Sequence, residues 1–141
     1  MFENCESLQY LKVGYNKPAP AVDMRKMFKN CKNLKILDLS NFDTDTIRYT
    51  QEMFSNCNSL TSLDLSKLIT RSVSNMTHMF YYTTNLENLD IRNFDTQYCS
   101  HFDKMFDGCY ENMTLTINKN KCSNIMNIIP DTVTINDINL L

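Results

Sequence analysis

Apolar residues recur along this chain at a fixed interval of 26 residues. A Met-Phe pair opens each interval, with the methionines at Met1, Met27, Met53, Met79 and Met105. Further columns at the same interval hold cysteine and leucine, and Thr83 is the exception in the cysteine column. Because several columns agree without a slip, we predict a stack of equivalent 26-residue segments, here called coils.

One half of each coil alternates in the manner of a short strand. The segments LKILDLS, LTSLDLS and LENLDIR share the pattern L-x-x-L-x-L, whose last two apolar positions flank a polar one. This alternation predicts a strand with one buried face. The predicted core columns are Phe28, Cys31, Leu34, Leu37, Leu39, Phe54, Cys57, Leu60, Leu63, Leu65, Phe80, Leu86, Leu89 and Ile91.

The other half of each coil has the spacing of an amphipathic helix. Apolar positions fall at i, i+3, i+6, i+7 and i+10 between Ile47 and Cys57. The predicted helix N-caps are Thr44, Thr70 and Thr96. A positive φ is predicted to end each helix in the column of Asn4, Asn30, Asn56 and Gly108, where Tyr82 is the strained exception.

These halves predict an α/β fold, a right-handed leucine-rich-repeat solenoid with a short parallel sheet on one face and helices on the other. One coil buries too little apolar surface to stand alone, so stacking must supply stability. The repeats are predicted over 1–117 and a shortened capping coil over 118–141, where VTIN at Val133 echoes LTIN at Leu115. At the other end the apolar edge around Phe2 and Leu8 is uncapped, and we expect upstream coils, a partner or self-association to cover it.

The motif MFxNCxNLxxLDLSNFDT runs from Met27 to Thr44 and recurs in part at 53–66 and 79–96. It resembles the 26-residue repeat of bacterial surface proteins, a branch of the BspA-like leucine-rich repeats. The resemblance extends from Met1 to about Ile117, and NKPAPAVD at 16–23 departs from it as an expected irregular loop. Members are typically non-enzymatic surface or secreted proteins of bacteria and some protists, with relatives in large DNA viruses. The resemblance therefore implies a binding scaffold linked to adhesion, with no catalytic residue.

The outward residues of the predicted strands form the candidate binding face. Its residues are Tyr10, Lys12, Lys35, Ile36, Asp38, Ser40, Thr61, Ser62, Asp64, Ser66, Glu87, Asn88, Asp90 and Arg92, and Tyr15 is a further aromatic candidate. In-register strands would align the three aspartates, whose mutual repulsion in water is about 0.8 kcal/mol per pair. Either the carboxylates are hydrogen-bonded within turns, or they form an acidic strip for a basic partner or a cation.

Net charge limits the classes of partner. The chain carries a formal charge of −2, which gives no footprint for nucleic acid, and no apolar run is long enough for membrane insertion. No signal peptide is visible in this chain. We expect a protein or surface-glycan ligand and, for a piece of a longer exported protein, a place at the cell surface or outside the cell. The alternative is a structural assembly subunit of a virion or cell envelope.

The cysteines are expected to be core residues, because their column lies on the inward stripe. No C-x-x-C pair suggests zinc, and no cofactor or metal is expected. Cys122 has no assigned role. A thiol–imidazole nucleophile formed by Cys99 and His101 is disfavoured, since Cys99 should point inward and His101 should not.

Overall fold

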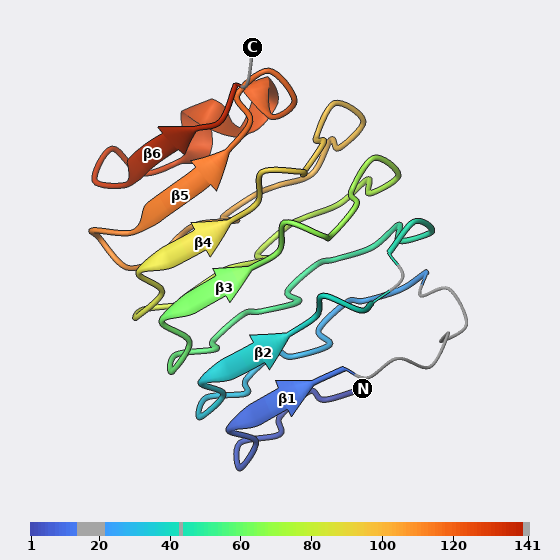
Figure 1. Cartoon of the computed structure of the whole chain (residues 1–141), viewed down its shortest axis with the longest axis vertical. Helices are drawn as coiled ribbons and strands as arrows, with labels where there is room; N and C mark the ends of the chain where they lie inside the picture. Colours follow the sequence, from blue (N-terminus) through green and yellow to red (C-terminus); the bar gives the residue numbers. More distant parts are fainter. Residues whose placement is uncertain (14–21, 43, 140–141) are drawn as a thin grey trace.

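The computed structural model describes residues 1–13, 22–42 and 44–139. Tyr15 and most of the expected loop at 16–23 lie outside the described residues. In the described ranges six short strands run side by side in chain order from the N-terminal to the C-terminal end (Figure 1). The strands are β1 (Tyr10–Lys12), β2 (Ile36–Asp38), β3 (Ser62–Asp64), β4 (Asn88–Asp90), β5 (Thr114–Ile117) and β6 (Thr134–Asp137).

The strands pair in parallel, and the register follows the sequence repeat. Leu11 pairs with Leu37 between β1 and β2, and Leu63 pairs with Leu89 between β3 and β4. Leu89 also pairs with Leu115 of β5, again 26 residues on. The parallel strands expected from L-x-L are therefore confirmed, although they form two sheets, β1–β2 and β3–β4–β5–β6.

The helices expected on the opposite side of the coils do not form in the described residues, so that expectation is wrong. The described part of the chain holds one 3₁₀ helix, η1 (Ser123–Ile128), and consecutive turns occupy the stripes that were expected to be helical. In the second coil the Met27 N–H donates to the Met24 carbonyl and the Cys31 N–H donates to the Phe28 carbonyl. The third residues of these two turns, Lys26 and Asn30, have φ of 57° and 61°, as type II turns require. Apolar side chains then recur at near-helical spacing without a helix.

The positive φ expected in the asparagine column is confirmed. Asn4, Asn30 and Asn56 have φ of 61°, 61° and 59°, Gly108 has 70° and Tyr82 has 55°. These residues end turns rather than helices. A second column of positive φ, which the composition did not signal, holds Lys26, Glu52, His78 and Lys104.

The side of the coils opposite the strands consists of these turns, and we call it the turn side. Hydrogen bonds between neighbouring coils join its turns into a continuous ladder. The Phe28 N–H donates to the Met53 carbonyl at 2.9 Å, and the equivalent bonds begin at Phe2, Phe54 and Phe80. Single parallel bridges also connect Asp23, Tyr49, Asn75 and His101 in sequence. The turn side thus links every neighbouring pair of the first five coils.

The core lies between the strands and the turn side. Every residue of the predicted core columns is buried. The phenylalanine rings at positions 2, 28, 54, 80 and 106 form one stack, with centroids 5.6–5.7 Å apart and planes within 12°. Thr44, Thr70 and Thr96 do not cap helices. Their buried side chains form hydrogen bonds to the backbone of the next coil. Thr70 Oγ1 donates to the Asp95 carbonyl at 3.0 Å and accepts the Asp95 N–H at 2.8 Å.

The C-terminal segment closes on β5 with a shorter circuit. Leu115 pairs with Ile135, a separation of 20 residues, whereas LTIN and its echo VTIN lie 18 residues apart in the sequence. A shift of two residues keeps the inward and outward phase of a strand, so both pairings satisfy the same pattern. η1 buries Ile125 against the core and ends at Ile128, before Pro130.

Candidate binding surfaces

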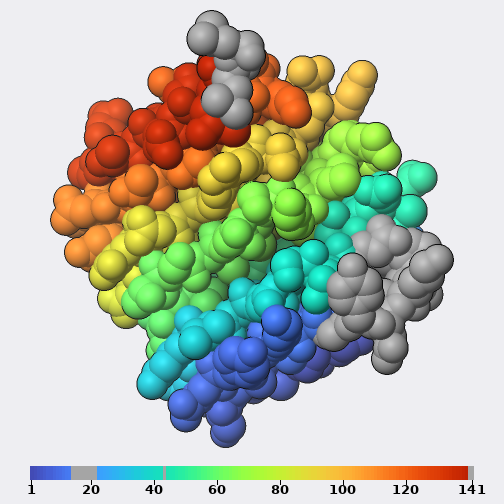
Figure 2. All heavy atoms as spheres, viewed as in Figure 1, coloured from blue at the N-terminus to red at the C-terminus, as the bar shows by residue number. Residues whose placement is uncertain are grey.

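The candidate binding face lies on the strand side of the coils. All of its predicted residues are exposed or half-buried, and the apolar side chains of Tyr10 and Ile36 are each 57% exposed. Figure 2 shows this side as successive bands of side chains, one for each coil. Outward positions of neighbouring coils lie next to one another because the strands pair in register, as Ser62, Asn88 and Thr114 do.

The aspartate column is engaged within its own turns. Asp38 Oδ1 accepts the Ser40 N–H at 3.0 Å, and Asp64 Oδ1 accepts the Ser66 N–H at 2.8 Å. Asp90 Oδ1 likewise accepts the Arg92 N–H, and both carboxylate oxygens of Asp90 accept hydrogen bonds from the Arg92 guanidinium. These geometries favour the structural interpretation of the column over an acidic strip.

Asp38 also pairs with Lys12, whose ammonium lies 3.2 Å from Oδ2. Hydrogen bonds from the Ser40 side chain and backbone, followed by Lys12, lower the pKa of Asp38 to about 2. The structure brings Asp64 and Asp90 directly opposite each other, whereas Asp38 lies in the other sheet. A shallow hollow of about 230 Å³ runs over β3, β4 and β5 beside this pair.

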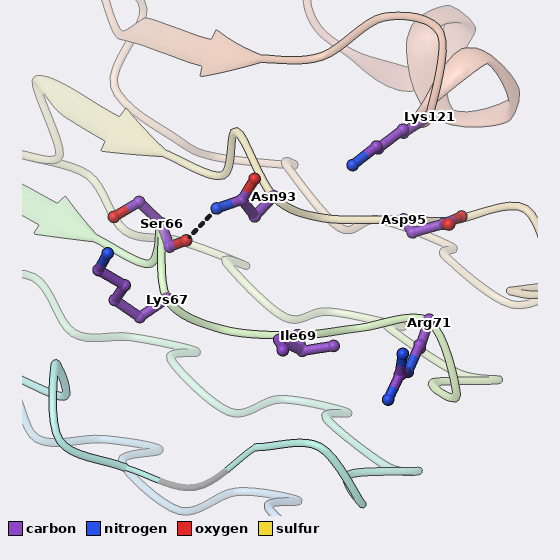
Figure 3. A pocket seen from close by; sticks show the side chains of 7 residues that line it. All are labelled: Ser66, Lys67, Ile69, Arg71, Asn93, Asp95 and Lys121. Carbon is purple, nitrogen blue, oxygen red and sulfur yellow. Dashed lines mark hydrogen bonds between the residues drawn. The ribbon is translucent and has the colours of Figure 1, made fainter.

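A second hollow, of about 360 Å³, lies beyond the ends of β3 and β4 and was not predicted from the sequence (Figure 3). Lys67 and Arg71 stand at the two ends of one wall, and Lys121 extends from the far side toward Asn93. None of these three cations makes an ion pair with a described residue. We call this site the basic hollow; its unpaired cations suit an anionic group.

A departure from the repeat could have revealed the basic hollow. The loop Asn93-Phe94-Asp95 matches the motif NFD, whereas Lys67-Leu68-Ile69 replaces it one coil earlier. Asp95 Oδ1 accepts the Gln97 N–H at 3.1 Å, a bond that Ile69 cannot make. The substitution removes a carboxylate, adds a cation and leaves Ile69 half-buried in the hollow.

The cysteine column serves the core. Cys31 and Cys57 are buried, and each thiol donates to the phenylalanine carbonyl of the previous coil at 3.0 Å. Burial raises the pKa of Cys57 to about 12 and that of Cys122 to about 11, which makes both thiols poor nucleophiles at neutral pH. Cys122, which had no assigned role, falls in the column of the buried threonines and donates to the Phe94 carbonyl at 3.3 Å.

The structure does not join Cys99 and His101 into a catalytic pair. The Cys99 thiol is buried and lies 3.5 Å from the backbone carbonyl of His101, whereas the exposed imidazole Nδ1 contacts Ser100 Oγ at 2.9 Å. Over residues 1–13, 22–42 and 44–139, no cluster of side chains suited to a metal ion occurs. No helix in the same ranges is long and apolar enough to cross a membrane.

Comparison with known proteins gives a family and no assigned activity. No curated protein matches the chain. A family described as "Mycoplasma protein of unknown function, DUF285" matches residues 1–129. The match takes in β1 to β5 and the whole of η1. The chain therefore belongs to the DUF285 family.

Proposed function

We propose that this chain is a non-enzymatic recognition scaffold, a right-handed leucine-rich-repeat solenoid similar to the BspA-like proteins, that serves as a surface adhesion or interaction module. The observation that carries the proposal is a contrast between adjacent positions of the strands. The inward residues are constant at Leu37, Leu63, Leu89 and Leu115, whereas the outward residues immediately before them vary and are Ile36, Ser62, Asn88 and Thr114. A constant frame that presents variable side chains in register is the design of repeat proteins that bind macromolecules.

The test is adhesion of the purified chain, coupled to beads, to cultured cells and to plates coated with matrix proteins. The double variant Ser62→Arg/Asn88→Arg adds bulk and charge to the strand face without touching the core. It is expected to reduce wild-type binding at least about tenfold. Ser72→Arg, another exposed serine outside that face, is the matched control and should bind as the wild type does. Absence of wild-type binding, or an equal loss in both variants, would reject the proposal.

A structural assembly subunit is the second candidate. Phe2 stacks on Phe28 at 5.6 Å, and Phe2, Cys5, Leu8, Leu11 and Val13 remain only half-buried at that edge. A partner or another copy that covered this edge would continue the phenylalanine stack. Analytical ultracentrifugation over a concentration series tests this candidate: association that Leu8→Asp abolishes would support it, and a monomer at all concentrations would argue against self-association.

A further inference from the structure

An aromatic cluster of His78, Tyr81 and Tyr82 lies on the turn side, away from the candidate binding face. The His78 and Tyr81 rings meet edge to face at 4.8 Å between centroids, and the Tyr81 and Tyr82 rings meet at 4.6 Å with an interplanar angle of 56°. Tyr82 is 48% exposed. The equivalent positions one coil earlier are Glu52, Ser55 and Asn56, so this coil alone among its described neighbours gathers three rings here.

Tyr82 adopts a strained backbone conformation. Its φ of 55° is unfavourable for a bulky side chain, and asparagine or glycine occupies the position in the other coils. Strained residues of this kind concentrate at functional sites. Gly108 of the next coil leaves room for the ring, because a Cβ there would lie 2.8 Å from Tyr82 Cδ2.

Tyr82 also interrupts a ladder of asparagine side chains. Asn30 Nδ2 donates to Asn4 Oδ1 at 2.7 Å, and Asn56 Nδ2 donates to Asn30 Oδ1 at 2.9 Å. An asparagine at position 82 would continue the ladder, but tyrosine has no amide to donate. Asn56 Oδ1 therefore receives no bond from a described side chain and is available as an acceptor beside the rings.

A hollow of about 240 Å³ adjoins the rings and is lined by Lys29, Glu52, Ser55, Asn56, His78 and Tyr81. Glu52 forms ion pairs with Lys29 and, at 3.7 Å, with Lys26. Partial burial acts to raise the pKa of Glu52, but Lys29, Lys26 and His78 together outweigh it and lower the pKa. Glu52 is thus a carboxylate acceptor at neutral pH, next to an ammonium donor and an amide acceptor.

We propose that the aromatic cluster and this hollow form a binding site for a neutral carbohydrate. A sugar ring has a C–H face that packs on an aromatic ring and a rim of hydroxyls that both donate and accept. Tyr81 provides the ring in the hollow, and Tyr82, which contacts the Tyr81 ring, extends the aromatic surface beside it. Asn56, Glu52 and Lys29 provide the partners for the hydroxyls. An apolar peptide segment is a poorer ligand, because it would remove water from the Glu52–Lys29 ion pair without offering hydrogen bonds in its place. The hollow is smaller than the pockets that enclose drug-sized ligands, so it suits one or two sugar units at the end of a glycan.

The test begins with the full chain on a panel of immobilised neutral and acidic glycans, followed by NMR titration with the neutral sugar that binds best. The wild type is expected to bind a neutral sugar and to shift the Tyr81 and Tyr82 ring signals. Tyr82→Asn should weaken binding about tenfold, the loss of one stacking partner. The same variant should keep or raise thermal stability, because asparagine tolerates positive φ and restores the ladder to Asn56. Tyr98→Asn, at a tyrosine that is 77% exposed, is the matched control for binding.

Three results would overturn the proposal: no neutral sugar bound, binding restricted to acidic glycans, or Tyr82→Asn lowering stability while binding is unchanged. The last result would make Tyr82 a structural residue. The site lies outside the candidate binding face, so its failure is separable from failure of the recognition scaffold. Ser62→Arg/Asn88→Arg should leave sugar binding intact even where it abolishes adhesion.

Discussion

The strand side and the turn side of this molecule are built from the same repeat, yet over the first five coils only the turn side is continuous among the described residues. Hydrogen bonds from Phe2, Phe28, Phe54 and Phe80 connect the first five coils in order without a break. On the strand side, ladder bonds join β1 to β2 and β3 to β6 in order, but the described residues show no pairing between β2 and β3. The side that carries the constant phenylalanine column has the regular ladder, and the interruption falls on the side where the outward residues 36, 62, 88 and 114 differ from coil to coil.

This contrast indicates that the turn side holds the coils together, whereas the strand side presents residues that can vary. The phenylalanine stack and the turns on the turn side hold the coils at a fixed spacing, with ring centroids 5.6–5.7 Å apart. The strands, at three or four residues each, add little burial of their own beyond one leucine face. Outward positions on the strand side can therefore vary at small cost to stability, which is what a recognition surface needs.

The largest expected effect comes from removing a ring in the middle of the stack. Phe54 is fully buried between Phe28 and Phe80, so Phe54→Ala should lower the free energy of unfolding by about 3–5 kcal/mol, measured by urea denaturation. Phe2→Ala, at the half-buried end of the stack, should cost less than half as much. Equal losses at the two positions would show that burial within the stack does not determine how much each ring stabilises the fold.

A methyl group at Gly108 should disturb the turn side next. Gly108 has a φ of 70°, and an added Cβ would lie 2.8 Å from the Tyr82 ring. Gly108→Ala should therefore cost about 2–3 kcal/mol by thermal or urea denaturation and displace Tyr82. In a Tyr82→Asn background the same change should cost only the backbone part, about 1 kcal/mol. An unchanged cost in that background would mean that the ring does not pack on Gly108.

Loss of the Thr70 hydroxyl, which lies between the strand side and the turn side, should lower the free energy of unfolding by less. Thr70→Val keeps the volume but leaves the Asp95 N–H without its partner, and Thr70 is 1% exposed. The expected loss is about 1–2 kcal/mol in the free energy of unfolding. Thr132→Val, at an exposed threonine, is the control and should change stability by less than about 0.5 kcal/mol.

The smallest effect is expected on the strand side, where Asp38 titrates. Its pKa falls from an ordinary value of 3.8 to about 2 in the folded chain. A lowered folded pKa contributes stability that is present above pH 3.8 and is lost as the pH falls through about 2. NMR titration should place the midpoint of the Asp38 carboxyl near pH 2, and Lys12→Ala should move it upward. A midpoint near 3.8 in the wild type would show that the Ser40 and Lys12 contacts are not maintained in solution.

The sequence predicted the parallel register because its evidence is repeated in every coil. The column of Leu63, Leu89 and Leu115 permits only one alignment, and the strands adopt it. Helices were a wrong prediction, since turns at Lys26 and Asn30 reproduce the same apolar spacing and lysine gives no sign of its positive φ. The echo of LTIN in VTIN predicted a shortened last coil, but not the 20-residue offset of β6, because a two-residue shift keeps the same face inward.

The candidate surfaces were predictable only where they follow the repeat. The outward strand residues do so and were identified one by one. The basic hollow joins Lys67, Arg71 and Lys121, which belong to different columns, so no single column marks it. Its signal, like that of the Tyr82 site, is a break in the pattern. In a repeat protein, residues that depart from a column are the better guide to function.

Backbone hydrogen exchange, measured by NMR, tests the division between the two sides most directly. The amides of Phe28, Phe54 and Phe80 donate to the next coil, and Glu87 donates across the β3–β4 pair. Thr61 and Ser62 occupy the same coil positions as Glu87 and Asn88, but within the described ranges their amides have no such partner on the β2 side. We predict exchange at least about tenfold slower for the three phenylalanine amides and for Glu87 than for Thr61 and Ser62. Equal protection at Thr61 and Glu87, or fast exchange along the phenylalanine ladder, would contradict the account.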